Sequence, residues 1–439
     1  MFDIDNFISQ EENHSRYKRR IDFLLENNLY IESIEKAVAS AVENIFEHKT
    51  RAFVIYGEPQ SGKTEMMIAL TARLLDEGFK IIIVLLNDNI TLLNQNLERF
   101  RRSDIDPAPK NFTEILDPSV NIGNSEWIIF CKKNSKNLQQ LISKLDNFQE
   151  KIIIDDEADY ATPNSKINKN EKNKINELIE KLLGEKGTYI GVTATPARLD
   201  LNYTFENEND KWIDFSPHTF YTGQDVFFPM NYEELSSLSY NLDLLPDEND
   251  DPKYLREALF NFFINVARIN LLAIKENKEE ENYCMIIHTS GKNVDQANDY
   301  RETIKVLNIL KDRDNKYFES YFKKIWEMSE KKYLGEEDNI TKYIIKNISR
   351  NLPVVINSDK DISTGYYESA TNPATLFTIA IGGNIISRGV TFKNLLSMFF
   401  TRDVKHKIQQ DTYIQRARMF GSRQKYLPYF SLHIPKNSF

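Results

Sequence analysis

Residues 57–64 read Gly57-Glu58-Pro59-Gln60-Ser61-Gly62-Lys63-Thr64, and this stretch decides the fold because it matches the phosphate-loop pattern G-x-x-x-x-G-K-[ST]. The two glycines let backbone N–H groups turn inward around a phosphate chain, and Lys63 reaches the terminal phosphates. The helix that follows offers its positive N-terminus to the anion. The pattern predicts a site for ATP and Mg²⁺ with Thr64 as a metal ligand, formed by Gly57, Glu58, Ser61, Gly62, Lys63, Thr64 and Glu65.

The segments around this loop alternate between short apolar runs and helical patterns. An apolar run at 52–56 precedes the loop and a helical pattern at 63–76 follows it, which disfavours a chance glycine-rich turn. Such alternation indicates a parallel sheet covered by helices on both faces. We expect further strands at 80–86, 127–131, 151–154 and 188–192, with helices near 91–101, 135–147 and 171–183.

The rest of the chain divides into three further parts. Residues 1–48 have helical periodicity, and residues 201–252 are polar and turn-rich, which is typical of a linker. Strands and helices then alternate again over 253–439, with a charged helical insertion at about 296–349. The sequence therefore predicts an α/β protein with a nucleotide-binding unit at 49–200 and a second parallel-sheet unit. In that second unit we expect a helix at 254–276 and strands at 283–289, 353–357, 376–381 and 395–401.

Four acids follow the apolar run Ile152-Ile153-Ile154, in the order Asp155-Asp156-Glu157-Ala158-Asp159. A buried strand that ends in acids places carboxylates at the carboxyl edge of the sheet, beside the phosphate loop. We assign Asp156 to Mg²⁺ and Glu157 to the attacking water, although Asp155 competes for the metal. Asp159 is expected to contact a neighbouring lobe or Thr193 instead.

A third pattern, Thr193-Ala194-Thr195-Pro196, follows the strand expected at 188–192. The hydroxyl groups of Thr193 and Thr195 are suited to hydrogen bonds with the acidic segment. The three patterns, in this order and spacing, resemble those of superfamily 2 helicases. That resemblance implies two RecA-like lobes, with the N-terminal helical segment added to the first and the helical insertion added to the second.

The second half carries two longer patterns, Gly382-Gly383-Asn384-Ile385-Ile386-Ser387-Arg388-Gly389-Val390-Thr391-Phe392 and Asp411-Thr412-Tyr413-Ile414-Gln415-Arg416-Ala417-Arg418-Met419-Phe420-Gly421-Ser422-Arg423. They resemble "GGN-x-x-SRG-x-T" and "DT-x-x-Q-x-x-R-x-FG-x-R" of the Z-one domain family. Members of that family carry an endonuclease label, have the architecture of superfamily 2 helicases, and often occur in bacterial restriction and phage-defence gene clusters.

The resemblance implies roles for several side chains of the second half. It places Gln415 beside the nucleotide and arginine fingers at Arg418 and Arg423, which would add charge at the γ-phosphate. Ala417 stands where the family has glycine, so the choice of finger stays open between Arg416, Arg418 and Arg423. The 387–391 segment is expected to contact nucleic-acid phosphate or the nucleotide through Ser387, Arg388, Gly389 and Thr391.

A track for nucleic acid is expected across the tops of both lobes, made mainly by contacts to phosphates. In the first lobe the candidates are the loop at 87–91 with Asn89 and Thr91, the pair Lys132-Lys133, and Arg198. A solvated loop is an equal alternative for the two lysines. His288 to Ser290 is a candidate in the second lobe. Arg99, Arg101 and Arg102 are interpreted as an ordinary helix end that favours cations.

The composition is that of a globular protein of 439 residues with a net charge of -9, which neither indicates nor excludes a nucleic-acid binder. The polar N-terminus and the short apolar runs predict a cytoplasmic protein without a membrane span. Cys131 and Cys284 are interpreted as reduced core residues, with a disulfide as the less favoured alternative.

Three functional hypotheses follow from these patterns. The first is an ATP-dependent translocase or helicase, acting on DNA rather than RNA within a bacterial defence or restriction system. The second is an endonuclease or a subunit that works with a nuclease partner, although no recognisable metal-nuclease pattern occurs. The third is a DNA-binding switch controlled by ATP that does not unwind its substrate.

Overall fold

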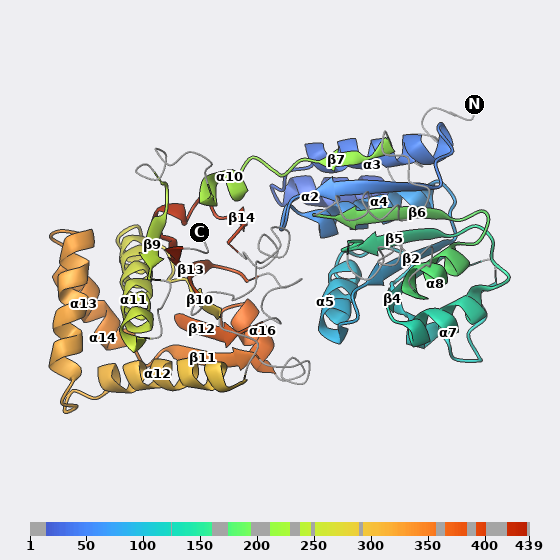
Figure 1. Ribbon diagram of the computed structural model, residues 1–439. Coiled ribbons are helices and arrows are strands. Elements are labelled where there is room, and N and C mark those ends of the chain that lie inside the picture. The colour runs from blue at the N-terminus through green and yellow to red at the C-terminus, as the bar shows by residue number, and fades with distance from the viewer. Residues whose placement is uncertain are drawn as a thin grey trace. The chain divides into compact units, whose positions relative to one another are not determined.

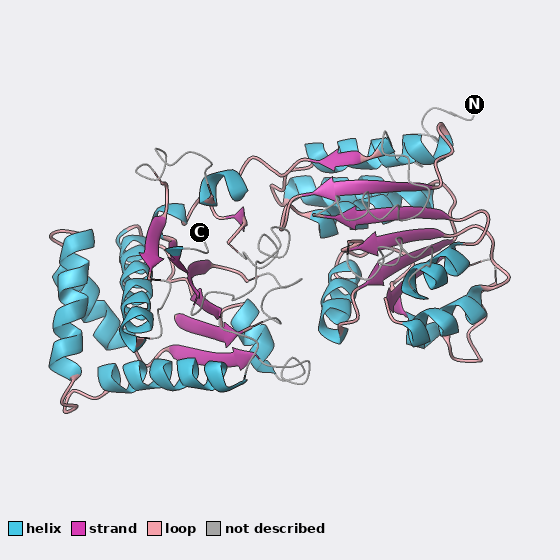
Figure 2. Ribbon diagram, viewed as in Figure 1, coloured by secondary structure: helices cyan, strands magenta, loops and turns pink. Residues whose placement is uncertain are grey.

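The protein is described from a computed structural model, in which two compact units, Met1–Thr219 and Phe220–Phe439, each enclose a core of their own. Figure 1 shows the elements of each unit, and Figure 2 shows that both units are built from strands and helices. The described residues are 15–123, 125–159, 174–194, 211–228, 238–246, 251–288, 293–356, 365–383, 392–400 and 419–436.

The sheet of the first unit contains seven described strands, all parallel, in the order β3-β4-β2-β5-β6-β1-β7. Because each strand is parallel to its neighbours, the carboxyl ends of all of them lie at one edge of the sheet. The strands are β1 (Ala52–Gly57), β2 (Ile81–Leu86), β3 (Lys110–Asn111), β4 (Trp127–Lys132), β5 (Ile152–Asp156), β6 (Thr188–Thr193) and β7 (Ile213–Phe215).

Helices cover both faces of this sheet. They are required because apolar side chains along each strand point alternately to the two faces. On β2, Ile82 and Val84 pack into one core and Ile81 and Ile83 into the other. The first core is covered by α2 (Arg16–Glu26), α3 (Glu32–Phe46), α4 (Lys63–Asp76) and α5 (Ile90–Arg101). The second is covered by α6 (Phe112–Ile115), α7 (Ser135–Leu145) and α8 (Lys174–Leu183).

The second unit has a parallel sheet in the order β11-β12-β10-β13-β15-β9, and a short antiparallel pair formed by β14 and β8. Its strands are β8 (Tyr221–Thr222), β9 (Asn241–Leu245), β10 (Tyr283–His288), β11 (Asn351–Ile356), β12 (Phe377–Gly382), β13 (Leu395–Phe400), β14 (Gly421–Ser422) and β15 (Ser431–Pro435). Its helices are α10 (Gln224–Phe227), α11 (Pro252–Lys275), α12 (Asn293–Lys311), α13 (Phe318–Lys332), α14 (Glu337–Asn347), α16 (Gly365–Thr371) and the 3₁₀ turn η4 (Leu427–Tyr429).

The helices α12, α13 and α14 occupy the expected insertion and pack with α11 into the core of the second unit. Leu307, Ile325 and Ile344 are buried there, so this segment is part of the core as well as a surface layer. By length and composition alone, α11 could cross a membrane. A single helix of this kind is weak evidence for a span, because the core helix of a globular protein passes the same test.

The fold class expected from the sequence is confirmed, with two RecA-like parallel sheets flanked by helices. The segment expected as a linker at 201–252 does more than connect the units, because it contributes β7 to the first sheet and β9 to the second. The described part of the N-terminal segment, from residue 15, forms the helices α2 and α3, and α2 packs directly on α4. Cys131 and Cys284 are both free and buried, as the sequence predicts.

Candidate nucleotide site

Five neighbouring strands of the first sheet end beside one another and supply every element of the candidate site. The phosphate loop follows β1, the acidic segment follows β5, and Thr193 ends β6, which lies between them. Asn87 follows β2 and Lys133 follows β4 on the other side of β5. Residues that are far apart in the sequence are therefore gathered at the carboxyl edge of the sheet.

The phosphate loop has a backbone path that requires its two glycines. Gly62 lies at φ 100°, in the left-handed region that disfavours side chains. A Cβ on Gly57 would lie 2.9 Å from Cδ1 of Phe215, which is closer than such atoms approach. Lys63 Nζ donates to the carbonyls of Gly57 at 2.9 Å and Glu58 at 2.7 Å, so the ammonium lies over the loop.

Donors at this loop fit a phosphate chain. The Ser61 hydroxyl is buried and has no hydrogen-bond partner among the described residues. Gly62 is the N-cap of α4 and has no side chain, so the N–H groups of the first turn do not donate to a cap side chain. With the Thr64 hydroxyl and the Asp156 carboxyl nearby, the residues present suit a nucleoside triphosphate with Mg²⁺.

The first acid of β5 is committed to a buried ion pair. Asp155 Oδ1 lies 2.8 Å from Lys133 Nζ, and both side chains are fully buried. Tyr189 Oη donates to Asp155 Oδ2 at 2.8 Å. Asp155 therefore does not compete for Mg²⁺, and of the two alternatives left open by the sequence Asp156 is the better ligand. Lys133 also donates to the carbonyls of Asp156 at 3.1 Å and Glu157 at 2.8 Å, which holds the acidic turn in place.

Asp156 ends β5, where the charge of Lys63 acts on it, and Glu157 follows in the acidic turn. Burial first, and the charge of Glu157 second, raise the pKa of Asp156 to about 7, while Lys63 and Lys133 oppose the increase. Glu157 has a left-handed backbone with φ 51°, a strained conformation for a residue with a side chain. Asn87 Nδ2 donates a short hydrogen bond to Glu157 Oε2 and fixes the orientation of the carboxylate.

The acidic turn is joined to the end of β6 by two hydrogen bonds. Thr193 Oγ1 donates to Asp159 Oδ1 at 2.7 Å, and the N–H of Ala158 donates to the carbonyl of Val192 at 3.1 Å. The contact that the sequence suggested for Asp159 is confirmed. The acidic turn and the carboxyl end of β6 are therefore held together.

Two basic residues have positions that sequence reasoning did not find. Lys133 was a candidate for the nucleic-acid track, which is wrong for this structure because its ammonium is fully buried against Asp155. Arg99 was interpreted as an ordinary helix end, yet its Nη1 lies 3.5 Å from Thr64 Oγ1 at the candidate site. The signal available in the sequence was weak: a lysine directly after a buried strand, and an arginine on the helix that follows β2.

Replacing Lys133 by methionine is expected to lower the free energy of unfolding of the first unit by about 3–5 kcal/mol, because it leaves the Asp155 charge buried without its cation. Chemical denaturation of the full chain, followed by far-ultraviolet circular dichroism, measures this loss. The neighbouring Lys132→Met is the matched control, since the Lys132 pair with Asp88 is partly exposed and contributes about 0–1 kcal/mol.

The double variant Lys133→Met with Asp155→Leu removes both charges and should recover most of the lost stability. Equal effects of Lys133→Met and Lys132→Met would show that the buried pair is not what holds the strand ends together.

The remaining candidate residues are distributed as follows. In the first unit, Asn89 Oδ1 accepts a hydrogen bond from the N–H of Leu92 at 3.0 Å and so caps α5. In the second unit, His288 ends β10, and its ring centroid lies 5.2 Å from that of Phe400. Arg423 is buried and donates to the carbonyls of Phe392 and Met419 at 3.3 Å. The described residues do not include Thr195, Arg198, Thr289, Ser290, Ser387, Arg388, Gly389, Thr391, Gln415, Arg416, Ala417, Arg418 and the side chain of Thr91.

Arg423 therefore joins the two patterns of the second unit, because Phe392 closes the first and Arg423 closes the second. Nη1 and Nη2 of Arg423 both donate to the carbonyl of Phe392. These two hydrogen bonds connect the segment before β13 to the turn after β14. Among the described contacts Arg423 acts within its own unit, and its role as an arginine finger stays a prediction, as does that of Arg418.

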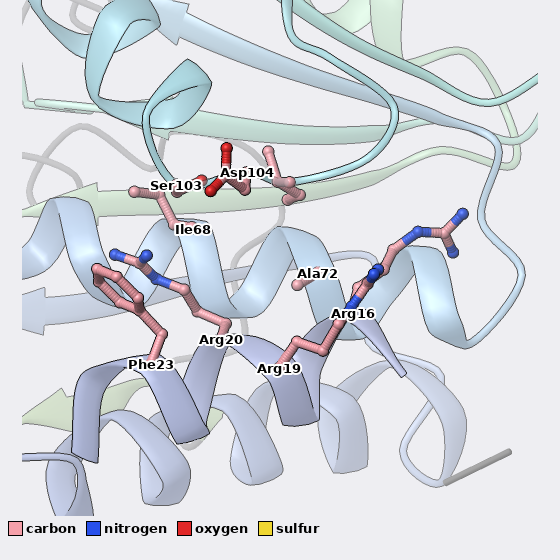
Figure 3. A pocket seen from close by; sticks show the side chains of 9 residues that line it. Arg16, Arg19, Arg20, Phe23, Ile68, Ala72, Ser103 and Asp104 are labelled. Carbon is pink, nitrogen blue, oxygen red and sulfur yellow. The ribbon is translucent and has the colours of Figure 1, made fainter. Parts of the chain in front are cut away.

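A cavity of about 220 Å³ opens elsewhere in the first unit, between α2, α4 and the turn after α5. Figure 3 shows Arg16, Arg19, Arg20 and Phe23 reaching into it from α2. Arg16 is paired with Glu126 at 2.5 Å, and Arg20 forms a short ion pair with Glu65. The cavity lies against the flank of α4 rather than at the phosphate loop, so it is not the candidate nucleotide site.

Two family models match the chain and together cover most of it. Residues 254–439 match the Z1 domain, and residues 28–198 match the res subunit of type III restriction enzymes. The resemblance inferred from the sequence motifs is thereby confirmed for these two segments, each of which spans less than half of the chain. No curated protein matches the sequence.

Solved structures support the same fold. The ATP-dependent Type ISP restriction-modification enzyme LlaBIII bound to DNA is 15% identical, with a TM-score of 0.51, over 92% of this chain and 27% of that chain. Dbp5 from S. cerevisiae, bound to RNA and ADP BeF3, is 12% identical, with a TM-score of 0.51, over 97% of this chain and 88% of that chain. The chain thus spans about a quarter of the length of LlaBIII. At these identities the likeness shows the fold alone.

Proposed function

We propose that the chain is an ATP-dependent translocase or helicase that acts on DNA as one component of a bacterial restriction or antiphage system. The observation that carries the proposal is the gathering of a phosphate loop, Asp156 and an oriented Glu157 at one sheet edge. The match of residues 28–198 to the res subunit of type III restriction enzymes supports DNA as the polymer.

The residues of the first unit have separate tasks in this proposal. Lys63 and the N–H groups at the start of α4 bind the phosphates, and Thr64 and Asp156 hold Mg²⁺. Bound Mg²⁺ supplies neutralising charge at the terminal phosphates. Glu157, oriented by Asn87, accepts the proton of the water that attacks the γ-phosphorus.

The hydrogen bond between Thr193 and Asp159 links the nucleotide site to the segment expected to bind the nucleic acid. It joins the acidic turn, which senses the γ-phosphate, to the strand end that leads to the expected nucleic-acid contacts at Thr195 and Arg198. ATP hydrolysis at the nucleotide site then changes how tightly the protein binds the phosphates of the nucleic acid. A motor requires this coupling.

Steady-state ATPase rates of the full chain with single-stranded DNA, duplex DNA and RNA, at one fixed salt concentration, test the choice of polymer. We expect DNA to raise the rate at least tenfold over the rate without polymer. Stimulation by RNA alone would replace DNA by RNA, and ATPase independent of any polymer would favour an ATP-controlled switch.

Cleavage of a plasmid without ATP would favour the endonuclease alternative. Among the described residues no group of three His, Cys, Asp or Glu side chains is placed to hold a metal ion, so no structural observation favours that alternative. A nuclease partner subunit remains part of the proposal and would be detected as ATP-stimulated cleavage that needs a second protein.

A further inference from the structure

Arg99 lies in the last turn of α5 and extends to the phosphate-binding end of α4. Its Nη1 is 3.5 Å from Thr64 Oγ1, the hydroxyl that follows Lys63. The charges of Glu65 and Asp156 both act on the guanidinium. A cation on a helix after β2 is thus placed beside the hydroxyl and the carboxyl proposed to hold Mg²⁺.

The basic residues around Arg99 are already paired, which sets Arg99 apart. Arg101 pairs with Glu114 at 3.0 Å and Arg102 with Glu98 at 3.1 Å, both at the surface. The carboxylate nearest in sequence to Thr64, that of Glu65, is bound by Arg20 from α2. In the described parts of the chain, no carboxylate lies within ion-pair distance of Arg99.

The guanidinium has five N–H donors in a fixed fork, a geometry that suits phosphate oxygens. Among the described residues, a single contact to a hydroxyl engages it, at the long end of the hydrogen-bond range. Arg99 thus places a cation beside the end of the phosphate loop, with most of its donors unused among the described contacts. Such a cation is suited to bind an anion that enters the loop. Thr64 marks the end of the loop at which Mg²⁺ and the terminal phosphates are bound.

We propose that Arg99 donates to the terminal phosphate of bound ATP and so selects ATP over ADP, from the same unit that carries the phosphate loop. This inference rests on the proposed function, because it requires ATP in the loop. ADP lacks the phosphate that Arg99 contacts, so the contact contributes to binding of the triphosphate only. In some nucleotide hydrolases an arginine of the same chain stabilises the charge on the transferred phosphoryl group.

Calorimetric titrations of the full chain with a non-hydrolysable ATP analogue and with ADP, each with Mg²⁺, test the proposal without any catalytic readout. For Arg99→Ala we expect affinity for the ATP analogue to fall about tenfold, a loss of about 1.4 kcal/mol, and affinity for ADP to change less than twofold. Arg99→Lys should recover part of the loss, because a single charge replaces the fork. Arg102→Ala, directly after the end of α5 and 75% exposed, is the matched control and should change neither affinity.

The possible results distinguish a failure of the inference about Arg99 from a failure of the proposed function. If the wild type binds both nucleotides and Arg99→Ala weakens both equally, or neither, Arg99 is structural and the inference is overturned while the proposed function stands. If the wild type binds neither nucleotide, the proposed function fails and the inference fails with it.

Discussion

Replacing Glu157 by glutamine is expected to lower kcat for ATP hydrolysis by about 100- to 10,000-fold, because the amide does not accept a proton from the attacking water. Binding of ATP should persist, since Glu157 is not a proposed ligand of the phosphates or of Mg²⁺. The amide nearly preserves the shape of the side chain and keeps an oxygen that accepts from Asn87. The variant therefore separates the chemical step from binding.

Phosphate release and filter retention of labelled ATP measure the two quantities on the same preparation. We expect little release and long retention of ATP for Glu157→Gln. Asn87→Ala, which removes the donor that orients the carboxylate, should lower kcat by a smaller factor. Glu177→Gln, on the exposed side of α8, controls for the loss of one negative charge. A Glu157→Gln variant with wild-type turnover would assign the water to a different residue.

Local patterns were enough to predict the centre of the first unit. The phosphate loop, the acidic strand end and the Thr193 segment each have a signal within a few residues, and short continuous apolar runs identify β1, β2, β5 and β6, which are buried along nearly their whole length. Similar runs predicted β10, β12 and β13 in the second unit. Strands such as β7 and β9 were missed because they are short and lie among polar, turn-rich residues.

The roles of single charged residues depend on which strands become neighbours, and one sequence does not show this. Asp155 and Asp156 are adjacent acids at the end of β5, and alternation only predicts that they face opposite sides. The order β4-β2-β5 brings Lys133 to Asp155 and so leaves Asp156 as the metal ligand. Arg99 was misinterpreted for the same reason, because its contact with Thr64 joins α5 to α4.

Replacing Lys63 by alanine is expected to reduce ATP hydrolysis to background and to weaken ATP binding more than tenfold. Lys63 is the cation of the loop itself, and its Nζ already lies within reach of the loop carbonyls that surround a phosphate chain. Of the cations that the structure describes at this sheet edge, none replaces it, because Lys133 is committed to Asp155 and, in our proposal, Arg99 reaches only the terminal phosphate. Lys80→Ala, an exposed lysine of the same unit, is the matched control.

The central claim is that this one loop in the first unit binds and hydrolyses ATP in response to a polymer. The most direct test compares phosphate release by the wild type and by Lys63→Ala at saturating single-stranded DNA, with melting temperature measured to verify folding. The account predicts DNA-stimulated hydrolysis by the wild type and by Lys80→Ala, and none by a folded Lys63→Ala. Equal hydrolysis by the wild type and by Lys63→Ala would contradict it.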